Sequence, residues 1–87
     1  MPYIKKNRRD WFDEIASDIS DVFANDESAT MGDLNYLITK ILLSTGPSSY
    51  ADYNDLIGML ECCKLEFYRR AVSVYEDEKI KENGDVY

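Results

Sequence analysis

After Pro47 the chain contains no further proline, and Gly58 is the only glycine before Gly84. Proline and glycine are the residues that most often end helices, so little in this stretch can interrupt one. Ser48 or Ser49 can cap its start, and Asp52 lies in the first turn. The pattern predicts a helix over about residues 50–80, on the order of 45 Å long at ~1.5 Å per residue.

Two shorter segments also have the apolar spacing of a helix. Apolar residues recur every three or four positions over residues 8–24, with acidic residues between them, and a similar face runs through residues 31–44. Thr30 and Asp33 form a capping box at the second start, and Gly46 followed by Pro47 ends that helix. We therefore expect an all-α single domain over residues 1–87, a small bundle of three helices with a long third helix.

The third helix is predicted to have more apolar surface than two short helices can cover. One stripe includes Leu56, Leu60 and Phe67, and a neighbouring stripe includes Cys62 and Leu65. Because a small domain has little core of its own, the second stripe favours self-association, and we expect a homo-oligomer. The alternative is that the chain wraps its own third helix completely.

Composition excludes several function classes. The 87 residues include ten Lys and Arg against seventeen Asp and Glu, a net charge of −7, so direct nucleic-acid binding by summed charge is not expected. With no histidine and only two adjacent cysteines, the chain lacks the usual ligands for zinc and the base of a catalytic triad. We expect no enzymatic activity, no catalytic residues, no bound metal and no cofactor.

Two further expectations concern location. No apolar run follows the basic residues near the N-terminus, as a secretory leader requires, and no stretch reaches the ~20 apolar residues of a membrane span. The sequence therefore predicts a cytoplasmic protein with no membrane partner.

The best candidate for an anion site is a cluster of cations and a ring in an otherwise acidic chain: Lys64, Tyr68, Arg69 and Arg70. Arg69 starts from a mostly apolar stripe, where a guanidinium needs a carboxylate or phosphate partner. The alternative is purely structural, with Glu66 paired to Arg70, Glu61 to Lys64, and Arg69 to a carboxylate of another chain.

Other residues could contact the base and the sugar of a ligand. Tyr36, Tyr68 and Tyr75 have rings on which a base can stack, although most such rings belong to cores or interfaces. Asn35 offers an amide one turn into the second helix.

Four segments carry a family resemblance: the opening MPYI, GDLNY (32–36), ECCKLEFYRR (61–70) and YEDEKIKENGDVY (75–87). With these motifs the chain resembles a family of small uncharacterised proteins carried by bacteriophages and bacteria. Small phage proteins of this build are similar in kind to anti-defence proteins that sequester nucleotide immune signals. The resemblance implies an oligomer in the infected bacterial cytoplasm that binds a cyclic ADP-ribose-type or cyclic dinucleotide ligand in pockets at subunit interfaces.

That reading assigns the ligand to a defined set of side chains: Arg69, Arg70, Lys64, Tyr68, Tyr36, Asn35 and Tyr75. A competing reading is an acidic helical module that inhibits a host protein directly, or a DNA mimic, because acidic residues concentrate in the first helix.

Overall fold

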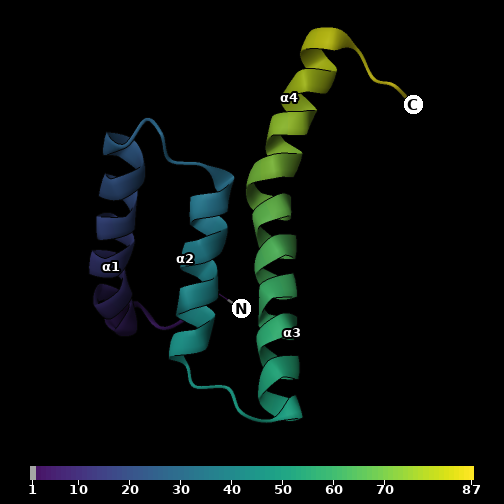
Figure 1. The fold of residues 1–87 in the computed structure, drawn as a ribbon. Coiled ribbons are helices and arrows are strands. Elements are labelled where there is room, and N and C mark those ends of the chain that lie inside the picture. Colours follow the sequence, from purple (N-terminus) through teal and green to yellow (C-terminus); the bar gives the residue numbers. More distant parts are fainter. Residues whose placement is uncertain (1) are drawn as a thin grey trace. The chain divides into compact units, whose positions relative to one another are not determined.

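A computed structural model describes residues 2–87, and every regular element in that range is helical (Figure 1). The elements are α1 (Lys6–Asn25), α2 (Met31–Ser44), α3 (Tyr50–Phe67), η1 (Tyr68–Val72) and α4 (Ser73–Asn83). The predicted all-α class, with three helical stretches of which the last is long, is confirmed. Residues 2–49 and 50–87 form two compact units, so the single domain expected over 1–87 stays a prediction.

In the first unit, α1 and α2 contribute half-buried apolar side chains. Ile19 and Phe23 from α1, and Leu34, Leu37 and Leu42 from α2, are less exposed than their neighbours. A shallow groove of about 300 Å³ lies beside them, lined by Ile15, Ile19, Val22, Phe23 and Leu37, with Asp18 and Asp33 also at its wall. α1 begins at Lys6, two residues before the predicted start, so the basic run lies inside the helix.

The loop between these helices is held by short polar contacts. Asp26 Oδ1 accepts hydrogen bonds from the Ser28 hydroxyl (2.6 Å) and backbone N–H (2.9 Å), and these lower the pKa of the Asp26 carboxyl. Thr30 then caps α2: its hydroxyl accepts from the Asp33 N–H at 3.4 Å, while Asp33 Oδ2 accepts from the Thr30 N–H at 2.8 Å. The predicted capping box is confirmed.

The predicted glycine stop after α2 is also present. The Gly46 N–H donates to the Leu43 carbonyl at 3.1 Å, and the φ angle of Gly46 is +71°. An L-residue rarely adopts that conformation, so glycine relieves the steric cost of leaving the helix here.

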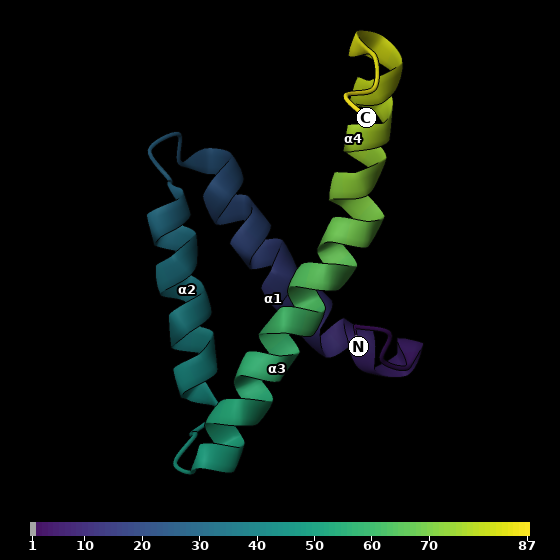
Figure 2. The same cartoon turned by 90° about the vertical axis from the view of Figure 1, so that its right-hand side faces the viewer.

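The second unit is one helical stretch of 34 residues, in which α3, η1 and α4 follow one another without a break (Figures 1 and 2). Its end lies at Asn83, three residues beyond the predicted end, where the Gly84 N–H donates to the Ile80 carbonyl at 2.8 Å. Gly84 has a φ angle of +88°, a second position that glycine occupies without strain.

No side chain in residues 2–87 is fully buried. Large apolar residues are exposed on every long helix, including Trp11 (79%), Tyr36 (67%) and Phe67 (67%). Self-association remains a prediction, and this exposure is the reason to retain it. Across the same residues, no helix combines the length and the apolar character that crossing a membrane requires.

Candidate functional site

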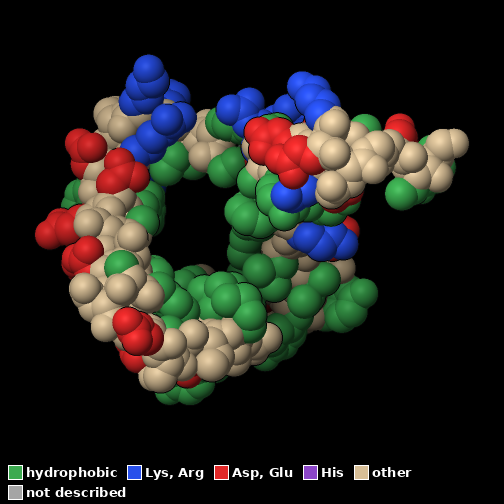
Figure 3. All heavy atoms as spheres, turned by 90° about the horizontal axis from the view of Figure 1, so that it is seen from above, with side chains coloured by type: hydrophobic (Ala, Val, Ile, Leu, Met, Phe, Trp, Pro, Cys, Tyr) green, Lys and Arg blue, Asp and Glu red, His purple; other side chains and the backbone are tan. Residues whose placement is uncertain are grey.

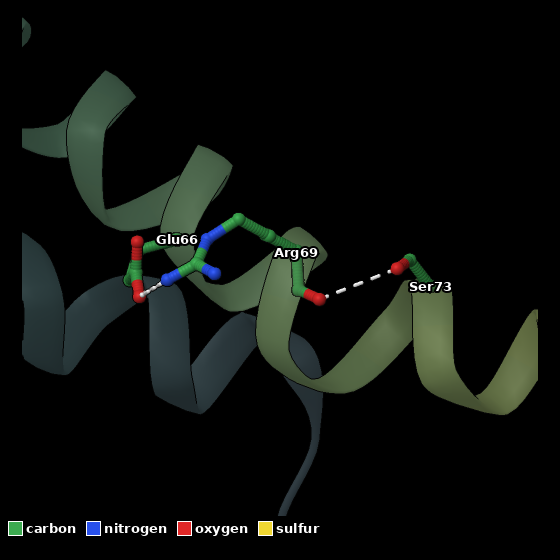
Figure 4. A network of polar contacts seen from close by, with 3 residues as sticks. All are labelled: Glu66, Arg69 and Ser73. Atoms are coloured by element: carbon green, nitrogen blue, oxygen red, sulfur yellow. Dashed lines mark hydrogen bonds and ion pairs between the residues drawn. The ribbon is translucent and has the colours of Figure 1, made fainter.

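The cation and ring cluster lies where the long helix changes its hydrogen-bonding pattern. Residues Tyr68–Val72 form a π-helix, in which the Ser73 N–H donates to the Tyr68 carbonyl five residues back. The Arg69 carbonyl, which a regular α-helix would pair with that N–H, instead accepts from the Ser73 hydroxyl at 3.2 Å (Figure 4). Ser73 thus satisfies two carbonyls of the widened turn.

Two cations of the cluster are paired with carboxylates one turn earlier. Lys64 Nζ lies 2.9 Å from Glu61 Oε1, and an Arg69 guanidinium nitrogen lies 2.7 Å from Glu66 Oε1 (Figure 4). The pair of Glu61 with Lys64 matches the structural alternative. Glu66 pairs with Arg69 and not with Arg70 as that alternative predicted, because positions three and four residues apart are both neighbours on a helix.

Tyr68 is held to the helix that follows. Its hydroxyl donates to the Glu76 carboxylate, a contact that joins η1 to α4. The hydrogen bond, together with the negative charge of Glu76, raises the pKa of the Tyr68 phenol. The ring itself remains half exposed, so its face is open to a ligand.

Arg70 and Tyr75 complete the candidate residues of this unit. Among the residues that the structure describes, Arg70 has no carboxylate within ion-pair distance. Tyr75 is 59% exposed, and Lys79 Nζ lies 5.4 Å from the centre of its ring, a cation–π distance. The helical stretch therefore carries one guanidinium outside the ion pairs and, separately, two accessible rings.

Asn35 and Tyr36 belong to the other unit, in the first half of α2. The Asn35 carbonyl accepts from the Thr39 hydroxyl at 2.8 Å, and Lys40 Nζ lies 5.9 Å from the centre of the Tyr36 ring. Both residues are exposed on their own unit. Their role at the same ligand as Arg69 stays a prediction.

Sequence reasoning treated the basic run near the N-terminus only as part of a possible leader. The structure places Lys5 at the cap position of α1, and Lys6, Arg8 and Arg9 in its first turn. In Figure 3 blue side chains gather at one end of the left-hand part of the molecule, next to red side chains that continue along it. The signal that could have identified this patch is the spacing of Arg8 to Trp11 and Phe12, three and four residues on.

The cysteines and carboxylates add no further site. Cys62 and Cys63 are exposed free thiols, and Cys63 Sγ lies 3.5 Å from Met59 Sδ. Across residues 2–87, no group of three His, Cys, Asp or Glu side chains is arranged to hold a metal ion.

The family model for a domain of unknown function, DUF6899, matches residues 1–86. The chain belongs to this family. The match is consistent with the predicted membership of an uncharacterised family and assigns no activity to the chain. No curated protein and no solved structure matches the chain.

Proposed function

We propose that this DUF6899 member is a phage-encoded anti-defence protein that binds and sequesters a nucleotide immune signal, without chemical conversion of the ligand. The observation that carries the proposal is the π-helix at Tyr68–Val72, which contains three of the four residues of the cation and ring cluster. A π-helical turn is rare, and it is found frequently at functional sites. The ligand class is a cyclic ADP-ribose-type molecule or a cyclic dinucleotide.

The ion pairs of the cluster do not block such a ligand. The side chains of Lys64 and Glu61 are 68% and 55% exposed, and the Arg69 side chain is 62% exposed. Exposed pairs of this kind contribute about 0–1 kcal/mol, whereas arginine binds a phosphate through two parallel hydrogen bonds. Exchange of a carboxylate for a phosphate is therefore inexpensive at Lys64. The Glu66 partner of Arg69 is only 21% exposed, so exchange costs more there, and Arg70 needs no exchange at all.

The proposal places the pocket between subunits. A single helix cannot enclose a ligand, and the stretch from Tyr50 to Asn83 is on the order of 51 Å long at ~1.5 Å per residue. Exposed Leu65, Phe67 and Val74 give it apolar side chains beside the cluster. A second copy would cover them and repeat the site by symmetry. In this arrangement Lys64, Arg69 and Arg70 bind phosphate, and Tyr36, Tyr68 or Tyr75 stacks the base, with Asn35 at the sugar.

The test is whether the pure protein retains a named nucleotide probe. The pure protein is mixed with cyclic ADP-ribose or with cyclic di-GMP and removed by filtration. It is then denatured, and the released material is identified by chromatography. We expect one probe to leave the filtrate and return intact, and we expect Arg70→Gln to lower retention at least tenfold.

Lys81→Gln is the matched control, because it removes the same charge from the same helical stretch outside the cluster. A probe that returns cleaved would show an enzyme, and complete passage of both probes would remove the support for sequestration. An equal loss of probe retention with Lys81→Gln would show that only the net charge matters.

One observation favours a second function, direct inhibition of a basic host protein. Five acidic residues of α1 are exposed and lie outside the ion pairs found among residues 2–87, namely Asp10, Asp13, Glu14, Asp18 and Asp21. Such a face attracts a basic partner through charge that salt screens. Pull-down from host lysate at low and high salt tests this function. It is favoured if a host protein binds at low salt and is lost at high salt, and if the chain retains neither nucleotide probe.

A further inference from the structure

We propose that the start of α1 is a second binding site, for a small molecule that joins a phosphate to an aromatic ring. Lys5 and Arg8 would bind the phosphate, and Trp11 and Phe12 would stack the ring. The site lies in the unit of residues 2–49 and uses none of the residues assigned to the sequestering cluster. It stands independently of the proposed function above.

The charges at this end of α1 are unmatched. Four of the ten cations of the chain lie between positions 5 and 9, and in residues 2–87 none of the four is in an ion pair. Arg9 donates from Nε to the Ile4 carbonyl at 3.1 Å, which leaves its charge uncompensated. Cations at the positive end of a helix dipole destabilise the helix, so a bound anion relieves this cost.

Four of the five acidic residues of α1 lie on the opposite side of the helix, and the fifth, Asp18, lies with Ile15 in the groove between α1 and α2. At about 100° per residue, Lys5, Arg8, Phe12 and Ile15 share one face with Trp11. By the same spacing, Asp10, Asp13, Glu14 and Asp21 fall on the other face. Charge and ring surface are therefore presented together, and Asp18, the acidic residue nearest to this face by spacing, follows Trp11 by about two turns and does not line the groove at Trp11 and Phe12.

The two rings are exposed and line a groove. Trp11 is 79% exposed and Phe12 is 51% exposed. With Arg8 and Ile15 they line a shallow groove of about 410 Å³, and no carboxylate lines it. A guanidinium beside an indole and a phenyl ring matches the two parts of a nucleotide, since arginine binds phosphate through paired hydrogen bonds and aromatic side chains stack bases.

The rival occupant of this face is a second copy of the chain, which would cover Trp11 and Phe12 by apolar contact. The charge favours the phosphate ligand, because the groove has Arg8 at its wall and Lys5 one turn before it. A symmetric contact between two such faces would bring like charges together.

The test uses Trp11, which is the only tryptophan in the chain. The full-length protein is titrated with 5′-AMP while tryptophan emission is recorded on excitation at 295 nm. Adenosine and inorganic phosphate are titrated separately. We expect saturable quenching by AMP, at least tenfold weaker quenching by adenosine, and displacement of AMP by excess phosphate.

Arg8→Gln should lower the affinity for AMP at least tenfold. We expect the circular dichroism of the variant to remain helical, because removal of a cation at this end of the helix is favourable. Lys81→Gln removes one charge elsewhere and should change nothing. Arg70→Gln should leave AMP quenching unchanged even where it lowers retention of a cyclic nucleotide, so failure of one site is distinguished from failure of the other.

Two results would overturn the proposal. The first is equal, non-saturable quenching by AMP and adenosine that Arg8→Gln does not alter. The second is tryptophan emission that shifts to shorter wavelength with protein concentration and ignores AMP, which would show that a second copy covers the face.

Discussion

The chain has two basic segments, and they differ in how their charges are matched. On the long helix Lys64, Arg69 and Lys79 each lie within 2.9 Å of a carboxylate oxygen three residues away. At the start of α1, the cations of residues 5–9 have no such partner within the described range, although Asp10 and Asp13 follow closely. The same residue types are therefore mostly paired in one unit, where Lys64, Arg69 and Lys79 have partners, and outside ion pairs at the start of α1.

The order of charges along the helix helps to explain this difference. Lys6 and Asp10, and Arg9 and Asp13, stand four residues apart with the cation first, which is the weaker order for a helix pair. Glu61 with Lys64, and Glu66 with Arg69, place the acid first, whereas Lys79 pairs with Glu82 with the cation first, so the order accounts for only part of the difference. A ligand at Lys64 or Arg69 must exchange partners, whereas an anion at Arg70 or at the start of α1 meets cations outside any ion pair among residues 2–87.

The largest effect expected from a single change concerns packing inside the unit of residues 2–49. Phe23 is half-buried at the groove between α1 and α2, so Phe23→Ala should lower the free energy of unfolding by about 1.5–2 kcal/mol, about half the cost at a fully buried site. Urea denaturation followed by circular dichroism measures this change.

Phe67→Ala is the matched substitution in the other unit. With Phe67 67% exposed, the expected loss is about 0.5 kcal/mol or less. A loss as large as that of Phe23→Ala, growing with protein concentration, would contradict this expectation and show that another copy covers the long helix.

A smaller effect is expected at the start of α2. Thr30→Ala removes the hydroxyl that accepts from the Asp33 N–H, and we expect the free energy of unfolding to fall by about 1 kcal/mol. Thr39→Ala is the control, because its hydroxyl only bonds back to the Asn35 carbonyl within the helix. If both variants lose the same amount in thermal unfolding, the capping box contributes nothing specific.

The smallest effect concerns titration of Tyr68. Its pKa is raised in the folded chain, so the contact with Glu76 is present below the ordinary phenol pKa of about 10 and is lost as the pH rises through the raised value. Glu76→Gln should shift one of the seven tyrosines to lower pH in a phenolate absorbance titration. A titration curve identical to that of the native chain would mean that Tyr68 and Glu76 are not in contact in solution.

Features governed by local sequence were predictable. The capping box at Thr30, the stop at Gly46 and the long third helix follow from side chains that act on their own backbone. The helix ends at Lys6 and Asn83 were missed by two and three residues, because polar residues continue both helices where the apolar period is absent.

The site could be predicted only in part. The cluster around Arg69 was identified from composition, and its partner Glu66 was among the carboxylates considered. The π-helix was not predicted, since Tyr68–Val72 contains no glycine or proline to signal a change. It depends on an exchange of hydrogen bonds at Ser73, which no periodic pattern records.

The widened turn at Tyr68–Val72 also changes the direction in which the side chains of α4 project around the helix axis. A turn closed by a bond five residues back takes one residue more than an α-helical turn, so the side chains of α4 are rotated relative to those of α3. A partner helix that follows one stripe of α3 would leave it on reaching α4. Any straight coiled coil along the full stretch is thereby disfavoured, and the two ends of one helix can serve two different neighbours.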